Sequence, residues 1–249
     1  MKTISFISPF CDLIKDLTSV SILDRAEKKK IVKYEYYNLF DFSDDSNNRI
    51  DDYPYGGGGG MILRAKPIFN AFHKIKDNQS KKNFRVIYPT PDGKKLDLNL
   101  SKKLALEDNI VFICGHYKGI DQRVRDTIVT DEISIGDYIL TGGELPSCII
   151  IDSMVRLIPG VLNTIESAET DSFNDGLLDT DYYTRPEDIN GLKVPEVLIS
   201  GNHKEIKKWR EQKKIEKTKL KRTDLYTNYI KNKPGIALLS MHFCVGKVL

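Results

Sequence analysis

The sequence lacks the residue clusters that hold metal ions or form a disulfide framework. It has four cysteines and four histidines among 249 residues. The cysteines are far apart, no C-x-x-C pair occurs, and the cysteines and histidines do not have the paired spacing of a zinc site. Separated thiols in a chain of this size are typical of a reducing compartment. We therefore expect no metal ligands among these side chains and a cytoplasmic protein.

Long hydrophobic runs are also absent. No apolar stretch approaches the roughly 18 residues that a membrane-spanning helix needs. Asp12 and Lys15 interrupt the apolar N-terminal segment before a signal-peptide core can form. Hydrophobic residues make up 40% and charged residues 29% of the chain, which are ordinary values for a globular protein. We expect no membrane partner and one or two globular domains.

The first two thirds of the chain alternate short apolar runs with helical patterns. Runs rich in Ile, Val, Phe and Tyr predict strands at Thr3–Ile7, Ile31–Tyr37, Phe84–Tyr88 and Ile110–Cys114. Helical spacing is present at Phe10–Lys28, Ala65–Asn78, Asp121–Asp126 and Glu144–Leu157. Nearly continuous apolar strands are typical of a parallel sheet that is covered on both faces. The pattern predicts an α/β fold with right-handed crossovers and, by the general rule, no knot.

The last third of the chain has a different composition. Residues 163–191 are rich in Asp, Ser, Thr and Asn and have little periodicity, so we interpret them as a flexible linker. This linker would separate a domain over residues 1–162 from a helical domain over residues 192–249. A helix is predicted at His203–Thr218, with Asn202 as its N-cap.

Glycine-rich segments are the most unusual local feature. Five consecutive glycines, Gly56–Gly60, follow a Pro-aromatic segment, and they form either a linker or a place where backbone amides approach a ligand closely. They lack the Lys-Ser/Thr ending of a phosphate-binding P-loop. Three further segments, Tyr88–Gly93, Cys114–Asp121 and Ile133–Glu144, are predicted to be loops that follow strands. Since ligands bind beyond the carboxyl ends of parallel strands, these loops form either one backbone-lined pocket or three unrelated turns.

Basic and aromatic residues near the C-terminus suit RNA. Lys204 to Arg222 contains ten Lys or Arg residues and three Glu residues, and Trp209 lies among them. Cations neutralise phosphates and aromatic rings stack on bases. The alternative is an ordinary solvated lysine face.

Two further charged residues lie apart from this segment. Arg156 lies among apolar residues and needs a partner if it is buried, and Asp171 lies in the polar segment of residues 163–191.

Taken in order, these segments resemble the bacterial tRNA (guanine-N1)-methyltransferase family of the SPOUT superfamily. The most specific matches are Ile133–Glu144 and Asp171–Leu178, and the resemblance runs from near residue 1 to about residue 230. It implies a trefoil-knotted α/β domain with helices on both faces of a parallel sheet, and a small helical C-terminal domain. It further implies an obligate homodimer with its active sites at the subunit interface, acting on tRNA.

The resemblance also implies an activity and its residues. The activity is transfer of a methyl group from S-adenosyl-L-methionine to N1 of the guanosine at position 37, directly 3′ of the anticodon. Asp171 would be the general base and Arg156 its companion. The substrate would contact Gly57, Gly58, Gly59, Gly60, Ser172, Arg185 and Trp209. The adenosylmethionine pocket would be formed by Tyr88, Pro89, Thr90, Gly115, Tyr117, Ile135, Gly136, Tyr138, Leu140, Gly142 and Gly143.

The chain departs from the family's common pattern at several positions. His116 replaces an arginine, Lys118 replaces a glutamate, and Tyr182 replaces a frequent histidine. Thr90 and Asp92 are milder changes. The family's reaction is helped by Mg²⁺, to which that glutamate is one proposed contributor, and a lysine cation cannot ligate a metal. A Mg²⁺ requirement is therefore the part of the resemblance that these residues support least.

Three other functions compete with this one. The first is an RNA-binding knot protein without catalysis, which the presence of both Arg156 and Asp171 disfavours. The second is a SPOUT methyltransferase that acts on another RNA base. The third is a nucleotide hydrolase, which the missing P-loop lysine disfavours.

Overall fold

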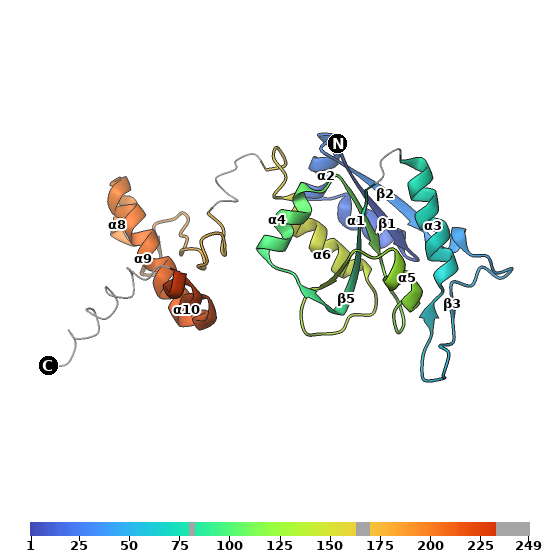
Figure 1. Ribbon diagram of the computed structural model, residues 1–249. Helices are drawn as coiled ribbons and strands as arrows, with labels where there is room; N and C mark the ends of the chain where they lie inside the picture. Colours follow the sequence, from blue (N-terminus) through green and yellow to red (C-terminus); the bar gives the residue numbers. More distant parts are fainter. Residues whose placement is uncertain (80–82, 163–169, 233–249) are drawn as a thin grey trace. The chain divides into compact units, whose positions relative to one another are not determined.

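The computed structural model describes residues 1–79, 83–162 and 170–232, and the chain divides into two units, Met1–Ile165 and Glu166–Leu249 (Figure 1). In the described part of the chain, no helix is both long and apolar enough to cross a membrane.

A parallel sheet forms the centre of the first unit. Among the described residues it has five strands in the order β2-β1-β6-β5-β7, and every pair is parallel. The strands are β1 (Lys2–Ser8), β2 (Val32–Asn38), β5 (Arg85–Lys95), β6 (Asn109–Ile113) and β7 (Asp131–Ser134). The four predicted strands and their parallel pairing are confirmed. The sequence reasoning missed β7, because it has only four residues and begins with the charged pair Asp131 and Glu132.

Helices cover both faces of this sheet (Figure 1). One core cluster joins the sheet to α1 (Cys11–Thr18), α2 (Ser21–Lys28), α4 (Leu98–Leu106) and α6 (Glu144–Val155), and the other joins it to α3 (Ala65–Asn78) and α5 (Gln122–Thr127). The predicted continuous helix Phe10–Lys28 is wrong. It is split into α1 and α2, because the chain leaves the helical conformation between them and Ser21 has a φ of 54°.

The segment Tyr88–Gly93 is not a loop, contrary to the sequence prediction. Strand β5 continues through it to Lys95. A bulge accommodates the two prolines, since both Pro89 and Lys94 are opposite Ile133 of β7. Prolines are tolerated at a bulge because the ladder hydrogen bond is already interrupted there.

After β7 the chain returns across the sheet. Residues 135–143 lead from β7, at the edge of the sheet, to α6, which packs against α1, α2 and α4. On the way the chain passes directly over the end of β6. Gly142 forms an antiparallel bridge with His116, and the Gly143 amide donates to the Gly115 carbonyl at 2.8 Å.

Two small elements complete the first unit. The 3-10 helix η1 (Leu39–Phe42) follows β2, and the short strands β3 (Asp51–Asp52) and β4 (Ile62–Leu63) pair as an antiparallel hairpin. The five glycines lie at the tip of this hairpin.

The second unit is mainly helical. It contains the hairpin β8 (Asp188–Ile189) and β9 (Leu192–Lys193), and the helices α8 (Glu196–Ile199), α9 (His203–Lys221) and α10 (Thr223–Asn232). The predicted N-cap is confirmed, because the Asn202 side chain accepts a hydrogen bond from the Glu205 amide. Residues of the segment that the sequence assigns to a linker pack on α9: Leu177 is fully buried, and the Leu178 amide donates to Thr218 Oγ1 at 2.8 Å.

Candidate functional site

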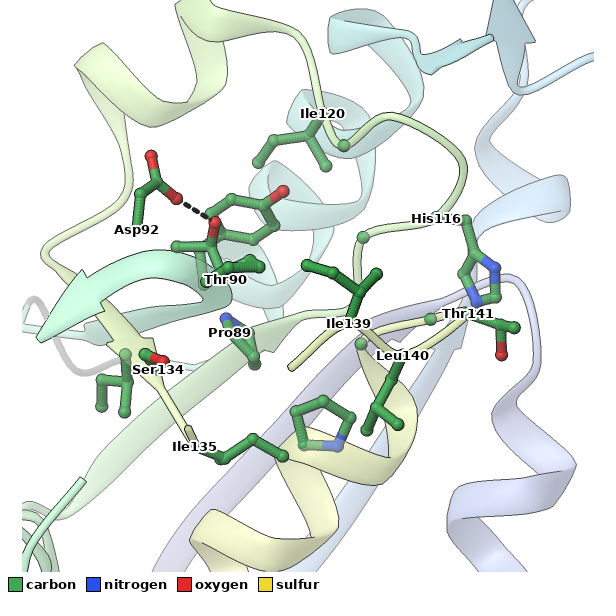
Figure 2. A pocket seen from close by; sticks show the side chains of 18 of the residues that line it. Pro89, Thr90, Asp92, His116, Ile120, Ser134, Ile135, Ile139, Leu140 and Thr141 are labelled. Atoms are coloured by element: carbon green, nitrogen blue, oxygen red, sulfur yellow. Dashed lines mark hydrogen bonds between the residues drawn. The ribbon is translucent and has the colours of Figure 1, made fainter. Parts of the chain in front are cut away.

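A cavity of about 580 Å³ lies beyond the carboxyl ends of β6 and β7, beside the bulged part of β5 (Figure 2). Most of its lining comes from three segments that are far apart in the sequence: Tyr88–Asp92, Gly115–Ile120 and Ile133–Gly143. Arg125 of α5 and Pro146 of α6 complete it. All eleven residues that the resemblance assigns to adenosylmethionine line this one cavity. They are Tyr88, Pro89, Thr90, Gly115, Tyr117, Ile135, Gly136, Tyr138, Leu140, Gly142 and Gly143. The three predicted segments therefore converge.

Glycine is required where two of these segments cross. A Cβ atom on Gly143 would lie 2.7 Å from the Gly115 nitrogen and 2.8 Å from Cys114 Cα. These neighbours are backbone atoms, so neither can move aside without shifting β6 or the segment that follows it. A Cβ atom on Gly115 would in turn lie 2.9 Å from the Tyr88 ring. The glycines thus let three backbone segments meet closely enough to form one wall.

One wall of the cavity is apolar and its two ends are polar. Pro89, Ile135, Ile139 and Leu140 contribute apolar side chains, with the Thr90–Asp92 pair at one end of the view and His116 at the other (Figure 2). A flat aromatic group with polar edges suits such a lining, because ligand pockets combine apolar walls with a few polar groups that fix orientation.

An ionic network holds the rim formed by β5. Arg125 on α5 contacts Asp92 at 2.6 Å and Glu132 at 2.6 Å, and its guanidinium lies 5.5 Å from the centre of the Tyr88 ring. Hydrogen bonds from Arg125 and then Thr90 lower the pKa of the Asp92 carboxyl. Sequence reasoning missed Arg125 as a lining residue, because no motif marks it and only the fold brings α5 beside β5.

The glycine hairpin lies beside the cavity but does not line it. The Lys118 amide donates to the Met61 carbonyl at 3.0 Å, and the Leu63 amide donates to the Gly119 carbonyl at 3.0 Å. These bonds attach β4 to the segment after β6. A Cβ atom on Gly60 would lie 3.1 Å from Lys118 Cγ, whereas Gly59 has no atom within 4 Å of such a position. The predicted substrate residues Gly57–Gly60 therefore form an open tip next to the rim that contains Lys118.

The buried thiols of the first unit are not nucleophiles. Cys11, Cys114 and Cys148 are free and buried. Burial raises the pKa of the Cys114 thiol well above its usual range, and it raises the pKa of Cys148 to about 12 and that of Cys11 to about 11. Because the thiolate is the reactive form, these three side chains pack as small apolar groups.

The remaining predicted site residues are divided between the two units. Arg156 is half-buried at the C-terminal end of α6 in the first unit. Asp171, Ser172, Arg185 and Trp209 belong to the second unit. There the Ser172 hydroxyl accepts a hydrogen bond from the Asp179 amide at 2.9 Å. The rings of Trp209 and Tyr183 lie 6.4 Å apart, centre to centre.

Comparison with known proteins assigns the chain to a family. The family model described as tRNA (Guanine-1)-methyltransferase TrmD matches residues 1–228. The chain belongs to this family. Two relatives named tRNA (guanine-N(1)-)-methyltransferase are each 51% identical to this chain. The protein from Lachnospira eligens matches over 89% of this chain and 94% of its own length, and the protein from Clostridioides difficile matches over 87% of this chain and 94% of its own length. The relative from Listeria innocua is 46% identical over 91% of this chain and 92% of its own length.

The tRNA (guanine-1)-methyltransferase match includes both units. It begins at residue 1, contains all the segments that form the cavity, and ends within α10. Residues 229–249 lie outside it. The sequence predicts no role for residues 234–249, and these positions also lie outside the described residues.

Proposed function

We propose that this protein transfers a methyl group from S-adenosyl-L-methionine to N1 of the guanosine at position 37 of tRNA. The observation that carries the proposal is the convergence of Tyr88–Asp92, Gly115–Ile120 and Ile133–Gly143 on one cavity, in a chain of the tRNA (guanine-1)-methyltransferase family. The cavity would hold the adenosylmethionine, and its close-packed glycine backbone would supply much of the contact.

The chemistry requires a base and an electrostatic partner. Guanine N1 carries a proton, so it becomes a nucleophile only when that proton is removed. In the proposed reaction the Asp171 carboxylate takes the proton, N1 forms a bond to the methyl carbon, and the sulfur–carbon bond breaks with its electron pair remaining on sulfur. Negative charge that spreads to O6 is stabilised by the Arg156 guanidinium. Gly57–Gly60, Ser172 and Arg185 would contact the guanosine and its neighbours.

The test is methyl transfer to two tRNA transcripts. One transcript has guanosine at position 37 and the other has adenosine there. We expect labelled methyl groups on the first only, mapped to N1. Methylation of both transcripts would place the target elsewhere and favour a SPOUT methyltransferase for another base. Binding of adenosylmethionine without transfer to either would favour a non-catalytic RNA-binding protein.

The same assay addresses Mg²⁺. Lys118 lies on the cavity rim, where the family commonly has a glutamate, and a lysine cation cannot ligate a metal. If the reaction uses Mg²⁺, its ligands are therefore other groups. A titration of Mg²⁺ against a chelator control measures the requirement directly.

We propose that α9 supplies the tRNA-binding surface. Among the residues that the structure describes, Lys213, Lys214 and Lys217 are paired with carboxylates, whereas Lys207 and Lys208 form no ion pair. Cations without a carboxylate partner are the more readily available to neutralise phosphates, because no ion pair has to be broken first.

Replacing Lys207 and Lys208 together by glutamine should weaken tRNA binding. Each lost phosphate contact should reduce the slope of log affinity against log salt by about 0.7 to 0.9, the values for single strands and for duplex DNA, so the pair should reduce it by up to about 2. Filter binding over a salt series measures this slope. The matched control replaces the exposed Lys74 and Lys103 of the first unit by glutamine. An equal change in both variants would contradict a specific role for α9.

We propose that the protein is a homodimer that uses the α1–α6 face. These two helices pack together, and each leaves large apolar side chains exposed: Leu13 on α1, with Phe10 just before it, and Leu145 and Ile149 on α6. A second copy of the chain would cover them and would complete the active site with Asp171 from its own second unit. Exposed apolar groups of this size on packed helices are typical of an interface.

Replacing Ile149 by glutamate should convert the dimer to a monomer and abolish methyl transfer, because a charge would be buried in an apolar contact. Light scattering coupled to size exclusion measures the mass. Leu106→Glu at the end of α4, where the side chain is already exposed, is the control and should remain dimeric. A wild-type monomer with full activity would rule out a site built from two subunits.

The path of the chain after β7 bears on the trefoil knot that the family resemblance implies. Residues 135–143 cross the end of β6 before α6 packs against α1, and we propose that this crossing threads the chain through its own preceding loop.

A further inference from the structure

The side chains of four residues and one backbone amide form a closed circuit at one end of the cavity, where His116 belongs to the lining. The Phe10 amide donates to Ser8 Oγ at 2.9 Å, and the Ser8 hydroxyl donates to Glu144 Oε1 at 2.5 Å. Glu144 Oε2 lies 2.7 Å from His116 Nε2, and the His116 ring meets the Phe10 ring edge-on with centres 4.9 Å apart. The circuit joins the turn after β1, the segment after β6 and the first residue of α6.

The centre of this circuit is a buried carboxyl group. Glu144 is only 2% exposed, and the His116 side chain is 15% exposed. Because a buried carboxyl is stable only when its oxygens are paired, both contacts are required. Its position in the first turn of α6 adds a favourable interaction with the helix N-terminus. A carboxylate only accepts hydrogen bonds, so we assign His116 the tautomer that carries its hydrogen on Nε2 and donates to Glu144 Oε2.

The same imidazole fills the space beside a cavity glycine. A Cβ atom on Gly142 would lie 2.3 Å from His116 Cε1 and 2.6 Å from Glu144 Oε2. His116 and Gly142 are also bridge partners, and the next residue, Gly143, donates to the Gly115 carbonyl. The His116–Glu144 pair therefore clamps residues 135–143 against the segment after β6, at the point where these two cavity walls cross.

We infer that His116 and Glu144 are positioning residues for the cavity: their hydrogen bond holds its two glycine walls in the arrangement that binds the methyl donor. The identity of that ligand rests on the proposed function. The role of His116 follows from the direction of Nε2, which points at Glu144.

Two substitutions of His116 separate a positioning role from a general loss of packing. The side-chain amide nitrogen of glutamine is separated from Cα by the same number of bonds as Nε2 of histidine. The His116→Gln side chain can therefore still donate a hydrogen bond to Glu144. In asparagine the amide nitrogen reaches only the position of Nδ1, so His116→Asn leaves the Glu144 oxygen unpaired. We expect His116→Asn to weaken adenosylmethionine binding by about 10- to 100-fold, the effect of one unpaired buried acceptor, and His116→Gln to stay within about 3-fold of wild type. His73→Asn, at an exposed site on α3, is the matched control and should bind like wild type.

A second measurement needs no ligand. Hydrogen exchange of the peptide that spans residues 135–144 reports the Gly143 amide in the free protein. It should be about 10-fold faster in His116→Asn and in Glu144→Gln than in wild type, and near wild type in His116→Gln. Unchanged exchange in His116→Asn would overturn the inference. A second outcome would also overturn the inference: both His116 variants bind adenosylmethionine equally weakly, although the exchange rate of the peptide is near wild type in His116→Gln and raised in His116→Asn. The imidazole would then contact the ligand directly. If wild type fails to bind adenosylmethionine, the proposed function fails, and the exchange comparison still decides the role of the clamp.

Discussion

Replacing Asp171 by asparagine is expected to lower the rate of methyl transfer by about 10²- to 10⁴-fold, the usual contribution of a general base. Asparagine has nearly the same shape but cannot accept the N1 proton. The cavity residues all lie in the first unit and Asp171 lies in the second, so the affinity for adenosylmethionine should change little. Single-turnover transfer and calorimetric titration with adenosylmethionine measure the two quantities separately.

A neighbouring carboxylate provides the control for this prediction. Asp181 also belongs to the second unit, and it contacts Lys217 at 2.9 Å on a partly exposed surface. Asp181→Asn should keep most of the activity, because an exposed ion pair contributes little to stability. If Asp171→Asn loses binding in proportion to rate, Asp171 holds the ligand and is not the base.

Replacing Gly143 by alanine should abolish measurable adenosylmethionine binding and destabilise the first unit. The added Cβ would lie 2.7 Å and 2.8 Å from backbone atoms of Gly115 and Cys114. Relief requires a shift of the segment that forms the opposite cavity wall. Overpacking of this kind costs about 1–3 kcal/mol, which corresponds to a fall in Tm of roughly 3–10 °C for a unit of this size. Thermal unfolding and titration with adenosylmethionine check the two effects.

Gly59→Ala is the matched control for stability and for adenosylmethionine binding. A Cβ atom on Gly59 would have nothing within 4 Å, so the same chemical change meets no neighbour. We expect an unchanged Tm and unchanged adenosylmethionine affinity. Normal binding by Gly143→Ala would show that the two walls separate easily, and it would contradict the close crossing on which the cavity depends.

Local sequence patterns predicted the elements with strong local signals. Apolar runs marked four strands, and helical spacing marked α3, α6 and α9. They missed β7 and the extension of β5 past Tyr88, because each is a strand only through pairing with the other. Alone, Asp131–Ser134 is short and charged, and Tyr88–Lys95 contains two prolines. Helix α4 was also missed, although its N-cap Asp97 bonds to the Leu100 amide in the usual way.

The site residues were likewise predicted only in part from the sequence. Glycine segments and their order were enough to name eleven cavity residues through a family resemblance, and all eleven line one cavity. Arg125 has no such signature, and its contacts with Asp92 and Glu132 arise only when α5 lies beside β5. His116 was notable in sequence only as a departure from the family pattern.

The sequence by itself determined the α/β class, the family, and the segments that carry the site, because these depend on composition, local periodicity and motif order. Only the tertiary structure decided which groups meet. Ser8 and Glu144 are 136 positions apart and His116 and Glu144 are 28 apart, yet they share one buried carboxyl group. Contacts of this kind follow from the path of the chain across the sheet, since strand order and burial bring distant residues together and local pattern carries no record of either.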